Sequence, residues 1–459
     1  MIGNILKPEL HQLIEQRNFT ELRNALCEFA PADIAEILGD LEPEDCAVML
    51  RVLPNHLAAD VLEHIEVEDL ENLLRALGNE DVARILNEME PDDRTAILEE
   101  LPAKATQRLI NMLSPDERRV AVTLLGYPEG SIARRMTPEY VMVKEDWTVD
   151  QVLQHLRQIG KKLESFNQLF VVEPGGRLVG VIRLRSILVS TGTTPVSELI
   201  EPQTLSLHAY DPQEEAVAIF RKYDRTTLPV LDSAERLVGV VTVDDVLDIS
   251  EEEATEDMQK MGGMQALDAS YMQTGLFAMI RKRVGWLILL FLGQMLTASA
   301  MGHYEDELAT ALVLALFIPL IISSGGNSGS QASTLIIRAL AMRDVTLSDW
   351  ARVFRRELVS GLVLGIILAG IGYARIVFSP NREAIFTDHY AMLGLAVSLS
   401  IVSVVCFGSV VGAMLPFLLS KFKLDPAVCS APFVATLVDV TGIIIYFSVA
   451  QAVLKGTLL

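Results

Sequence analysis

The stretch APFVATLVDVTGIIIYFSVAQAV, residues 431–453, is apolar almost throughout and carries one carboxylate, Asp439. About 20 apolar residues are enough for a helix to cross the hydrocarbon core of a bilayer. An ionisable side chain at the centre of such a span costs about 3 kcal/mol or more, so it rarely faces lipid. Asp439 is therefore the first candidate functional residue, because it must face a water-filled path, a partner group or an ion.

Further apolar stretches precede this one, and together they predict an all-α transmembrane domain of five helices. They lie at residues 284–301, 308–340, 358–378 and 391–419. The second is expected to be broken around SSGGNSGSQ, residues 323–331. Small residues at membrane depth either leave irregular backbone lining a cavity or allow close helix packing, and the sequence leaves both readings open.

Basic residues predict the orientation of these spans, because they mark the cytoplasmic side. They precede the first span, separate the second from the third, and separate the fourth from the fifth: Arg281, Lys282, Arg283, Arg343, Arg352, Arg355, Arg356, Lys421 and Lys423. The opposite loops are residues 303–307, which hold three acids, and residues 379–390, which hold one base, Arg382. We expect a cytoplasmic N-terminus and a C-terminus outside a bacterial-type plasma (inner) membrane.

Charge is distributed unevenly along the chain. Residues 281–459 hold 13 Lys/Arg and 10 Asp/Glu, a net of +3; subtraction from the totals of 38 and 60 leaves −25 for residues 1–280. So acidic a segment does not bind nucleic acid non-specifically, but it attracts cations. The four cysteines show no disulfide spacing, which fits a reducing compartment, and no cleaved signal peptide is expected at the N-terminus.

Residues 1–130 predict an all-α, superhelical and acidic domain. LEPED at 41–45 recurs as MEPDD at 89–93 and, more weakly, as LSPDE at 113–117. In each copy a proline suits the first helical position, and the acids behind it favour the positive helix N-terminus. Repeated helical units of this kind stack on one another.

Residues 131–250 predict a duplicated α/β module. GRLVGVI at 176–182 recurs as ERLVGVV at 235–241, each after a short apolar strand, at residues 168–172 and 227–231. A helix precedes each strand, at residues 149–159 and 213–222. The pair resembles tandem CBS domains, which as a class sense ligands, often adenine nucleotides, and do no chemistry of their own.

Residues 251–280 predict an acidic connector, or plug, helix between this module and the transmembrane pore domain, residues 281–459. Ser250 is expected to cap the helix. Its first turns continue a dense run of carboxylates that repel one another unless cations or water screen them. The run comprises Asp244, Asp245, Asp248, Glu251, Glu252, Glu253, Glu256 and Asp257.

With these parts in order, the whole chain resembles the MgtE family of magnesium channels and transporters. The motifs that carry the resemblance are PLIISSGGNSGSQASTLIIRALA at 319–341, VGAMLPFLL at 411–419, PFVATLVDVTGIIIYFSVA at 432–450 and VTVDDVLDISEEEATED at 241–257. The resemblance implies a homodimer with a pore between two membrane domains, uptake of Mg²⁺, and gating by cytosolic Mg²⁺. It also implies ATP or another adenine nucleotide as a candidate ligand of the CBS pair, and no enzymatic activity.

The resemblance implies site residues one at a time. Those implied for the ion path are Asp439, Ala435, Thr436, Gly325, Gly326 and Asn327. Those implied for metal binding are Asp439 again and the cytosolic acids Asp224, Asp245, Asp248, Glu253, Glu256, Asp257, Glu214, Asp92 and Asp93. The chain departs from the family pattern at Ala431, where some members have asparagine, and at residues 95–97, where an acid is replaced.

The alternatives are a proton-coupled transporter of a divalent cation such as Co²⁺ or Mn²⁺, and a membrane-anchored CBS nucleotide sensor without transport. A lone membrane aspartate can titrate, which keeps the first open. The second explains neither Asp439 nor the small residues at 323–331. An intramembrane aspartyl protease needs two membrane carboxylates, and only Asp439 qualifies. Mg²⁺ requires octahedral oxygen ligands, and no His/Cys cluster near the spans favours a softer metal.

Overall fold

The computed structural model describes residues 2–39, 41–65, 67–160, 163, 166–201, 203–267, 271, 274–380, 386 and 389–455. The chain forms two compact units, Met1–Glu251 and Glu252–Leu459. Most of the predicted outer loop at 379–390, including Arg382, and the C-terminal residues after Lys455 lie outside the described residues.

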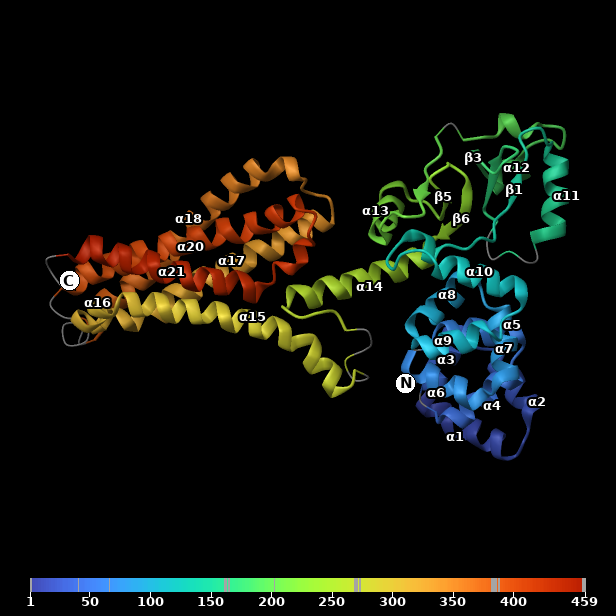
Figure 1. Cartoon of the computed structure of the whole chain (residues 1–459), viewed down its shortest axis with the longest axis horizontal. Helices are drawn as coiled ribbons and strands as arrows, with labels where there is room; N and C mark the ends of the chain where they lie inside the picture. The colour runs from blue at the N-terminus through green and yellow to red at the C-terminus, as the bar shows by residue number, and fades with distance from the viewer. Residues whose placement is uncertain are drawn as a thin grey trace. The chain divides into compact units, whose positions relative to one another are not determined.

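The first unit begins with short helices stacked around one apolar core (Figure 1). They are α1 (Ile2–Glu15), α2 (Phe19–Leu26), α3 (Pro31–Gly39), α4 (Pro43–Val52), α5 (Asn55–Glu63), α6 (Val67–Leu77), α7 (Asn79–Glu88), α8 (Pro91–Glu100), α9 (Ala103–Ile110) and α10 (Pro115–Leu125). As the repeats predict, Pro43, Pro91 and Pro115 each stand at the start of a helix. Buried Arg94 donates hydrogen bonds to Leu86 O and Met89 O, which ties α8 to α7.

Two small sheets of like topology follow, each with a parallel pair and an antiparallel pair of strands. The first copy comprises η1 (Ile132–Arg135), β1 (Met142–Val143), α11 (Val149–Ile159), β2 (Gln168–Val172), β3 (Leu178–Arg183) and α12 (Leu184–Val189). The second comprises η3 (Val196–Glu198), β4 (Leu207–His208), α13 (Gln213–Tyr223), β5 (Thr227–Leu231), β6 (Leu237–Thr242) and α14 (Val243–Met261). The duplicated α/β module is confirmed.

The connector differs from the expectation. Ser250 lies inside α14 and does not cap a new helix, because residues 243–261 contain no glycine or proline to interrupt the helix. The helix also ends well before α15 begins at Leu276. The connector is therefore not one helix running directly into the first membrane span.

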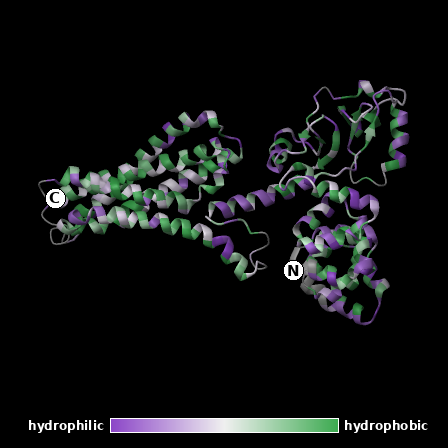
Figure 2. Cartoon of the chain, viewed as in Figure 1, coloured by the Kyte–Doolittle hydropathy of each residue, from purple (hydrophilic) through white to green (hydrophobic). Residues whose placement is uncertain are grey.

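The second unit contains five helices long and apolar enough to cross a membrane among its described residues. They are α15 (Leu276–His303), α17 (Ile318–Ala341) with η4 (Leu312–Phe317) before it, α18 (Trp350–Val377) after η5 (Leu347–Asp349), α20 (Tyr390–Lys421) and α21 (Ala431–Leu454). Short pieces complete it: α16 (Glu305–Thr310) and η6 (Pro426–Val428). In Figure 2, hydrophobic residues predominate along these long helices.

The expected break at residues 323–331 is wrong: α17 is continuous through them. The small residues permit backbone contact with α20, because a Cβ added at Gly408 would lie 2.3 Å from Gly325 O and one added at Gly412 would lie 2.1 Å from Gly329 O. Close packing through small residues, one of the two readings that the sequence left open, therefore applies on this face. Ser328 and Ser409 hydroxyls share a buried hydrogen bond of 2.6 Å across the same contact.

Candidate functional site

Asp439 lies about a third of the way along α21 and is partly buried. Gln294 of α15 donates a hydrogen bond from Nε2 to Asp439 Oδ2 at 3.1 Å. Within the described residues, the other carboxylate oxygen, Oδ1, accepts no hydrogen bond. One oxygen is thus oriented by an amide while the second is available to a water molecule or an ion.

The residues one turn before Asp439 hold α21 between its neighbours. Ala435 faces α17, where a Cβ added at Gly326 would lie 3.6 Å from the Ala435 Cβ. Thr436 faces α15, where a Cβ added at Gly293 would lie 2.7 Å from the Thr436 Cγ2. The Thr436 hydroxyl donates to Pro432 O at 2.9 Å. Both predicted residues therefore serve helix contacts at the level of the carboxylate.

The three α17 residues assigned to the ion path lie in different surroundings. Gly325 is buried, and a Cβ there would lie 2.5 Å from Val404 of α20. Gly326 is also buried, against α21. Asn327 is exposed and donates to Ser323 Oγ at 3.4 Å. The exposed face of α17 therefore carries a polar stripe of Ser323, Asn327 and Gln331, spaced four residues apart.

A cavity of about 410 Å³ lies at the far end of α21 from its N-cap. Its lining comes from α16 and from the end of α21: Asp306, Glu307, Thr310, Gln451 and Lys455. Gln451 Nε2 donates to Glu307 Oε1 at 2.5 Å. The acidic loop that the sequence placed outside the membrane therefore borders this end of α21.

In the first unit, acids at the start of α14 face the end of α5. Asp245 accepts hydrogen bonds from Thr242 N and Oγ1, at 3.2 and 2.5 Å, and so helps to start α14. Partial burial raises the pKa of Asp248, although the Arg135 guanidinium opposes it. Burial also raises the pKa of Glu63 on α5, and Asp60, Asp248 and Asp244 raise it further while His64 lowers it. Carboxylates from two helices thus repel one another here.

Asp224 caps α13 with a left-handed backbone, φ 49°, and lines a cleft of about 570 Å³. The cleft also presents Tyr223, Arg183, Arg185 and Arg225. Within the described part of the chain, the buried Nε of Arg225 has no hydrogen-bond partner. A ring, a carboxylate and guanidinium groups around this volume suit an anionic ligand with an aromatic part. Glu214, also predicted to bind metal, is exposed at the first turn of α13.

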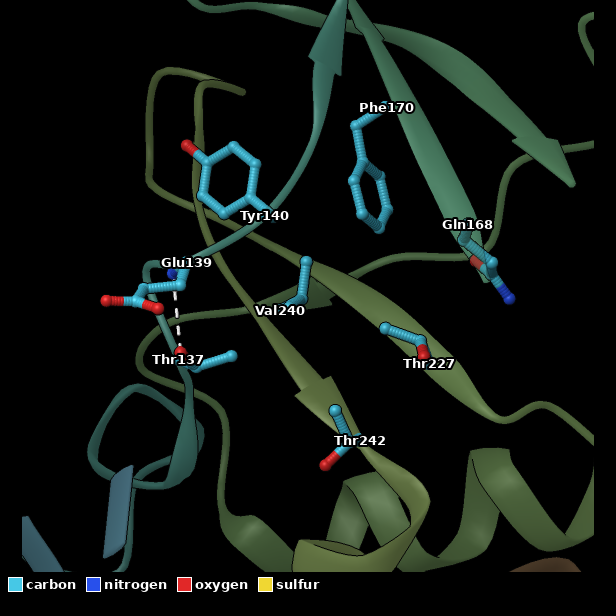
Figure 3. A pocket seen from close by; sticks show the side chains of 8 residues that line it. All are labelled: Thr137, Glu139, Tyr140, Gln168, Phe170, Thr227, Val240 and Thr242. Carbon is cyan, nitrogen blue, oxygen red and sulfur yellow. Dashed lines mark hydrogen bonds between the residues drawn. The ribbon is translucent and has the colours of Figure 1, made fainter. Parts of the chain in front are cut away.

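A second cavity of the α/β module has a volume of about 10 Å³, room for about one water molecule. Figure 3 shows its lining: Thr137, Glu139, Tyr140, Gln168, Phe170, Thr227, Val240 and Thr242. The rings of Tyr140 and Phe170 meet edge to face with centroids 6.0 Å apart, and the Tyr140 hydroxyl donates to Leu237 O at 3.0 Å. This cavity has no room for a nucleotide as it stands, in contrast to the cleft beside Asp224.

Asp92 and Asp93 gather with Glu90 at the start of α8, where carboxylate oxygens of the three residues lie within 4.8 Å of one another. It is the one such group of metal-ligating side chains among the described residues. On α14, Glu253, Glu256 and Asp257 are partly buried, and Glu256 Oε1 pairs with Lys260 Nζ at 2.5 Å. The structure thus distributes the predicted cytosolic acids over several separate places.

Sequence reasoning missed several of these groups. Glu90 stands in the MEPDD motif, so its repeat position could have indicated it. Gln294 and Glu63 carry no local signal, since each is defined by a residue far along the chain. Lys260 was missed as well: its partners are Glu256 and Asp425, and the second is 165 residues away.

Comparison with known proteins bears directly on this arrangement. Residues 29–130 match the model of the MgtE intracellular N domain, residues 130–190 and 196–252 match the CBS domain, and residues 318–449 match a divalent cation transporter family, MgtE. A protein named magnesium transporter MgtE from Thermus thermophilus is 43% identical over 72% of this chain and 72% of its own length. The chain belongs to the MgtE family.

The chain is also similar to other MgtE proteins. The magnesium transporter MgtE of Enterococcus faecalis is 33% identical over 72% of this chain and 71% of its own length. A crystal structure of the cytosolic domain of the Mg²⁺ channel MgtE in complex with ATP matches with a TM-score of 0.50 at 36% identity, covering 52% of this chain and 98% of that one. This MgtE family member is accordingly a multi-pass membrane protein with an MgtE N domain and a CBS pair.

Proposed function

We propose that the chain is a Mg²⁺ channel or transporter in which the Asp439 carboxylate attracts the ion to its path. The observation that carries the proposal is a single carboxylate in an apolar membrane helix, held by one amide and with one oxygen available. Membership of a divalent cation transporter family and relatives named magnesium transporters support it. Of the remaining predicted path residues, Ala435, Thr436, Gly325 and Gly326 pack α21 against its neighbouring helices. Asn327 lies on the exposed face of α17.

The chemistry of Mg²⁺ favours a path with few direct ligands. The ion gives up its waters reluctantly and requires octahedral oxygen coordination. A path that conducts it must bind strongly enough for entry and weakly enough for exit. One carboxylate from each of two subunits can accept hydrogen bonds from the water shell of a hydrated ion. Asp439 therefore acts on a hydrated cation rather than as part of an all-protein cage.

The exposed polar stripe of Ser323, Asn327 and Gln331 supports a homodimer as the functional state. Polar side chains at membrane depth are stable against lipid only when protein or water covers them. A second copy of the chain supplies that cover, and a path between two copies places two Asp439 residues around one axis. The distribution of basic loops supports an N-terminus in the cytoplasm and a C-terminus outside, in a bacterial-type inner membrane.

The acidic first half of the chain senses the transported ion. Residues 1–130, 131–250 and 251–280 form the N domain, the CBS pair and the connector ahead of the pore domain at 281–459. Bound Mg²⁺ replaces repulsion between carboxylates with attraction, which shifts a two-state equilibrium toward the compact, closed form. The predicted ligands are Asp224, Asp245, Asp248, Glu253, Glu256, Asp257, Glu214, Asp92 and Asp93.

ATP is the proposed ligand of the cleft beside Asp224. The cleft is large enough, and Arg185 supplies a cation for phosphate groups. Arg183 and Arg225 add positive charge, although both also pair with the carboxylate of Glu201. A relative's cytosolic domain was crystallised with ATP, which supports the choice. Nucleotide binding here modulates the gate and contributes no chemistry.

Flux into liposomes tests the proposal. The purified chain is reconstituted, and Mg²⁺ entry is followed with an internal indicator, first at equal pH on both sides and then with a pH gradient. A channel gives Mg²⁺ entry down its gradient that is independent of ΔpH. Entry that requires the pH gradient would assign a proton-coupled transporter, and the same assay with Co²⁺ and Mn²⁺ in place of Mg²⁺ would identify its cation. An absence of cation entry under both conditions would leave a CBS sensor without transport.

A further inference from the structure

Lys260 stands where the connector meets the membrane helices. Its ammonium donates to Asp425 Oδ2 at 2.8 Å and pairs with Glu256 Oε1 at 2.5 Å. Glu256 is one turn earlier on α14, and Asp425 belongs to the short loop between α20 and α21. A single cation thus bridges the connector helix and the segment that leads directly into the helix of Asp439.

A second hydrogen bond, separate from the contact with Lys260, orients the carboxylate of Asp425. Its Oδ1 accepts a hydrogen bond from Ala427 N at 2.8 Å, which caps η6 and leaves Oδ2 directed at the ammonium. Partial burial acts to lower the pKa of Lys260, but the hydrogen bonds to Asp425 and Glu256 outweigh it, so that pKa lies above its ordinary value. Lys260 is therefore charged throughout the neutral range.

Apolar contacts surround this charged bridge. Met261 packs against Ile337, Ala427 and Cys429, and the last two belong to the loop before α21. Gly263 has a left-handed backbone, φ +77°, and a Cβ there would lie within 3.3–3.4 Å of Ser430, Pro432 and Trp286. The end of α14 consequently lies against the cytoplasmic end of α21.

We propose that Lys260 is a built-in cation that holds the connector against the end of α21, at the place between Glu256 and Asp425 that a divalent cation would otherwise bridge. The proposal rests on the proposed function for its effect on flux, but the docking itself does not depend on conduction. Removing the ammonium leaves two carboxylates facing each other, which favours release of the connector when divalent cations are absent. Mg²⁺ then restores the bridge, since carboxylate oxygens are ligands that it accepts.

Labelling of Cys429 measures the docking directly. Cys429 is buried under Met261. In the full-length chain in lipid nanodiscs, with Cys27, Cys46 and Cys406 replaced by serine, a water-soluble maleimide reacts with Cys429 in proportion to the released fraction. With EDTA present, Lys260→Met should raise the labelling rate about fivefold, the effect expected for loss of one partly exposed ion pair. Lys260→Arg should retain the parent rate. Lys421→Met, which removes a positive charge that has no ion pair within the described residues, is the matched control.

The response of the labelling rate to Mg²⁺ distinguishes loss of the charged bridge from a general loss of stability. Adding Mg²⁺ should return the Lys260→Met labelling rate to that of the parent. Asp425→Asn keeps an oxygen for Ala427 N but removes the charge, so it should label faster in EDTA and respond little to Mg²⁺. In liposomes, Lys260→Met should conduct more than the parent at low internal Mg²⁺ and be blocked more steeply as Mg²⁺ rises. Parent-like labelling of Lys260→Met, or labelling that Mg²⁺ does not slow, would overturn the proposal, whereas absent flux with the predicted labelling would overturn only the proposed function.

Discussion

The contact between α17 and α20 and the contact between α14 and the end of α21 are held by different forces. The first is made of backbone against backbone at Gly325, Gly329, Gly408 and Gly412, with almost no room for added atoms. The second is a partly exposed ammonium between two carboxylates. Shape complementarity does not respond to ions, whereas a charged bridge in contact with water does. The comparison separates a fixed scaffold around Asp439 from a connector that ions can release.

The largest loss of stability is expected from a substitution that disrupts the contact between α17 and α20. Gly412→Ala places a Cβ about 2.1 Å from Gly329 O, and because that atom belongs to the backbone, a helix must move. Overpacking of this kind costs about 3 kcal/mol. Size-exclusion profiles and thermal stability in detergent should show aggregation or early unfolding.

Gly370→Ala is the matched control, since nothing lies within 4 Å of its added Cβ. It should remain as stable as the parent. Equal stability of the two variants would contradict the account of the fixed contact.

Neutralising acids in the first half of the chain should weaken the inhibition of flux by internal Mg²⁺. Asp224→Asn, Asp245→Asn and Asp248→Asn together should raise the internal Mg²⁺ concentration for half-inhibition by at least about tenfold, because several ions must act together to shift such an equilibrium. Ion selectivity should not change. Flux at increasing internal Mg²⁺ checks this.

A triple variant elsewhere, Glu28→Gln, Glu129→Gln and Glu145→Gln, removes the same charge. It should retain the parent inhibition. Similar curves for the two triple variants would reduce the cluster to an ordinary solvated surface.

Acidification should stabilise the contact between α5 and α14, which is another contact that depends on charge. Burial and the neighbouring Asp60, Asp248 and Asp244 raise the pKa of Glu63 above its ordinary 4.5, so the formed contact binds more protons than the separated helices. Its stability therefore falls as pH rises through the raised pKa and increases on acidification toward pH 5. In EDTA, amide exchange at the end of α5 should be slower at pH 5 than at pH 7 after correction for intrinsic rates.

Glu63→Gln should remove most of this dependence, although Asp60 and Asp248 keep a share because burial raises the pKa of each of them as well. A parent-like pH response in that variant would show that the groups of α5 and α14 are not coupled.

The smallest effect concerns the hydroxyl pair inside the fixed contact. Ser328→Ala leaves Ser409 without its partner across the helices, a loss of about 1 kcal/mol. Ser448→Ala, which removes only a bond to the α21 backbone, should cost less. Thermal unfolding of the two variants in detergent compares them, and equal shifts would assign the Ser328 bond no role between helices.

The positions of helices and strands could be predicted from the sequence where a local hydrophobic period and turn residues define them. The strand at 168–172 and the helix at 149–159 lie where period and turn residues placed them. The break in the second span was wrong, because glycine in a membrane helix reflects close approach as readily as irregular backbone. The Ser250 cap was wrong because a serine inside an unbroken helix carries no stop signal.

The candidate site could be predicted only in part, for a related reason. Asp439 was visible because one carboxylate stands out in an apolar stretch. Its partner Gln294 and the bridge from Lys260 to Asp425 depend on contacts between residues 145 and 165 positions apart. No local period encodes such pairs.

The central claim is that the charge of Asp439 attracts the conducted ion within a fixed scaffold. The direct test is Mg²⁺ entry into liposomes for Asp439→Asn beside the parent, at low internal Mg²⁺ so that the gate is open. Asparagine keeps the shape and can still accept from Gln294 but loses the charge, so stability should be unchanged while flux falls by more than about tenfold. Parent-like flux in Asp439→Asn would remove the carboxylate from the mechanism.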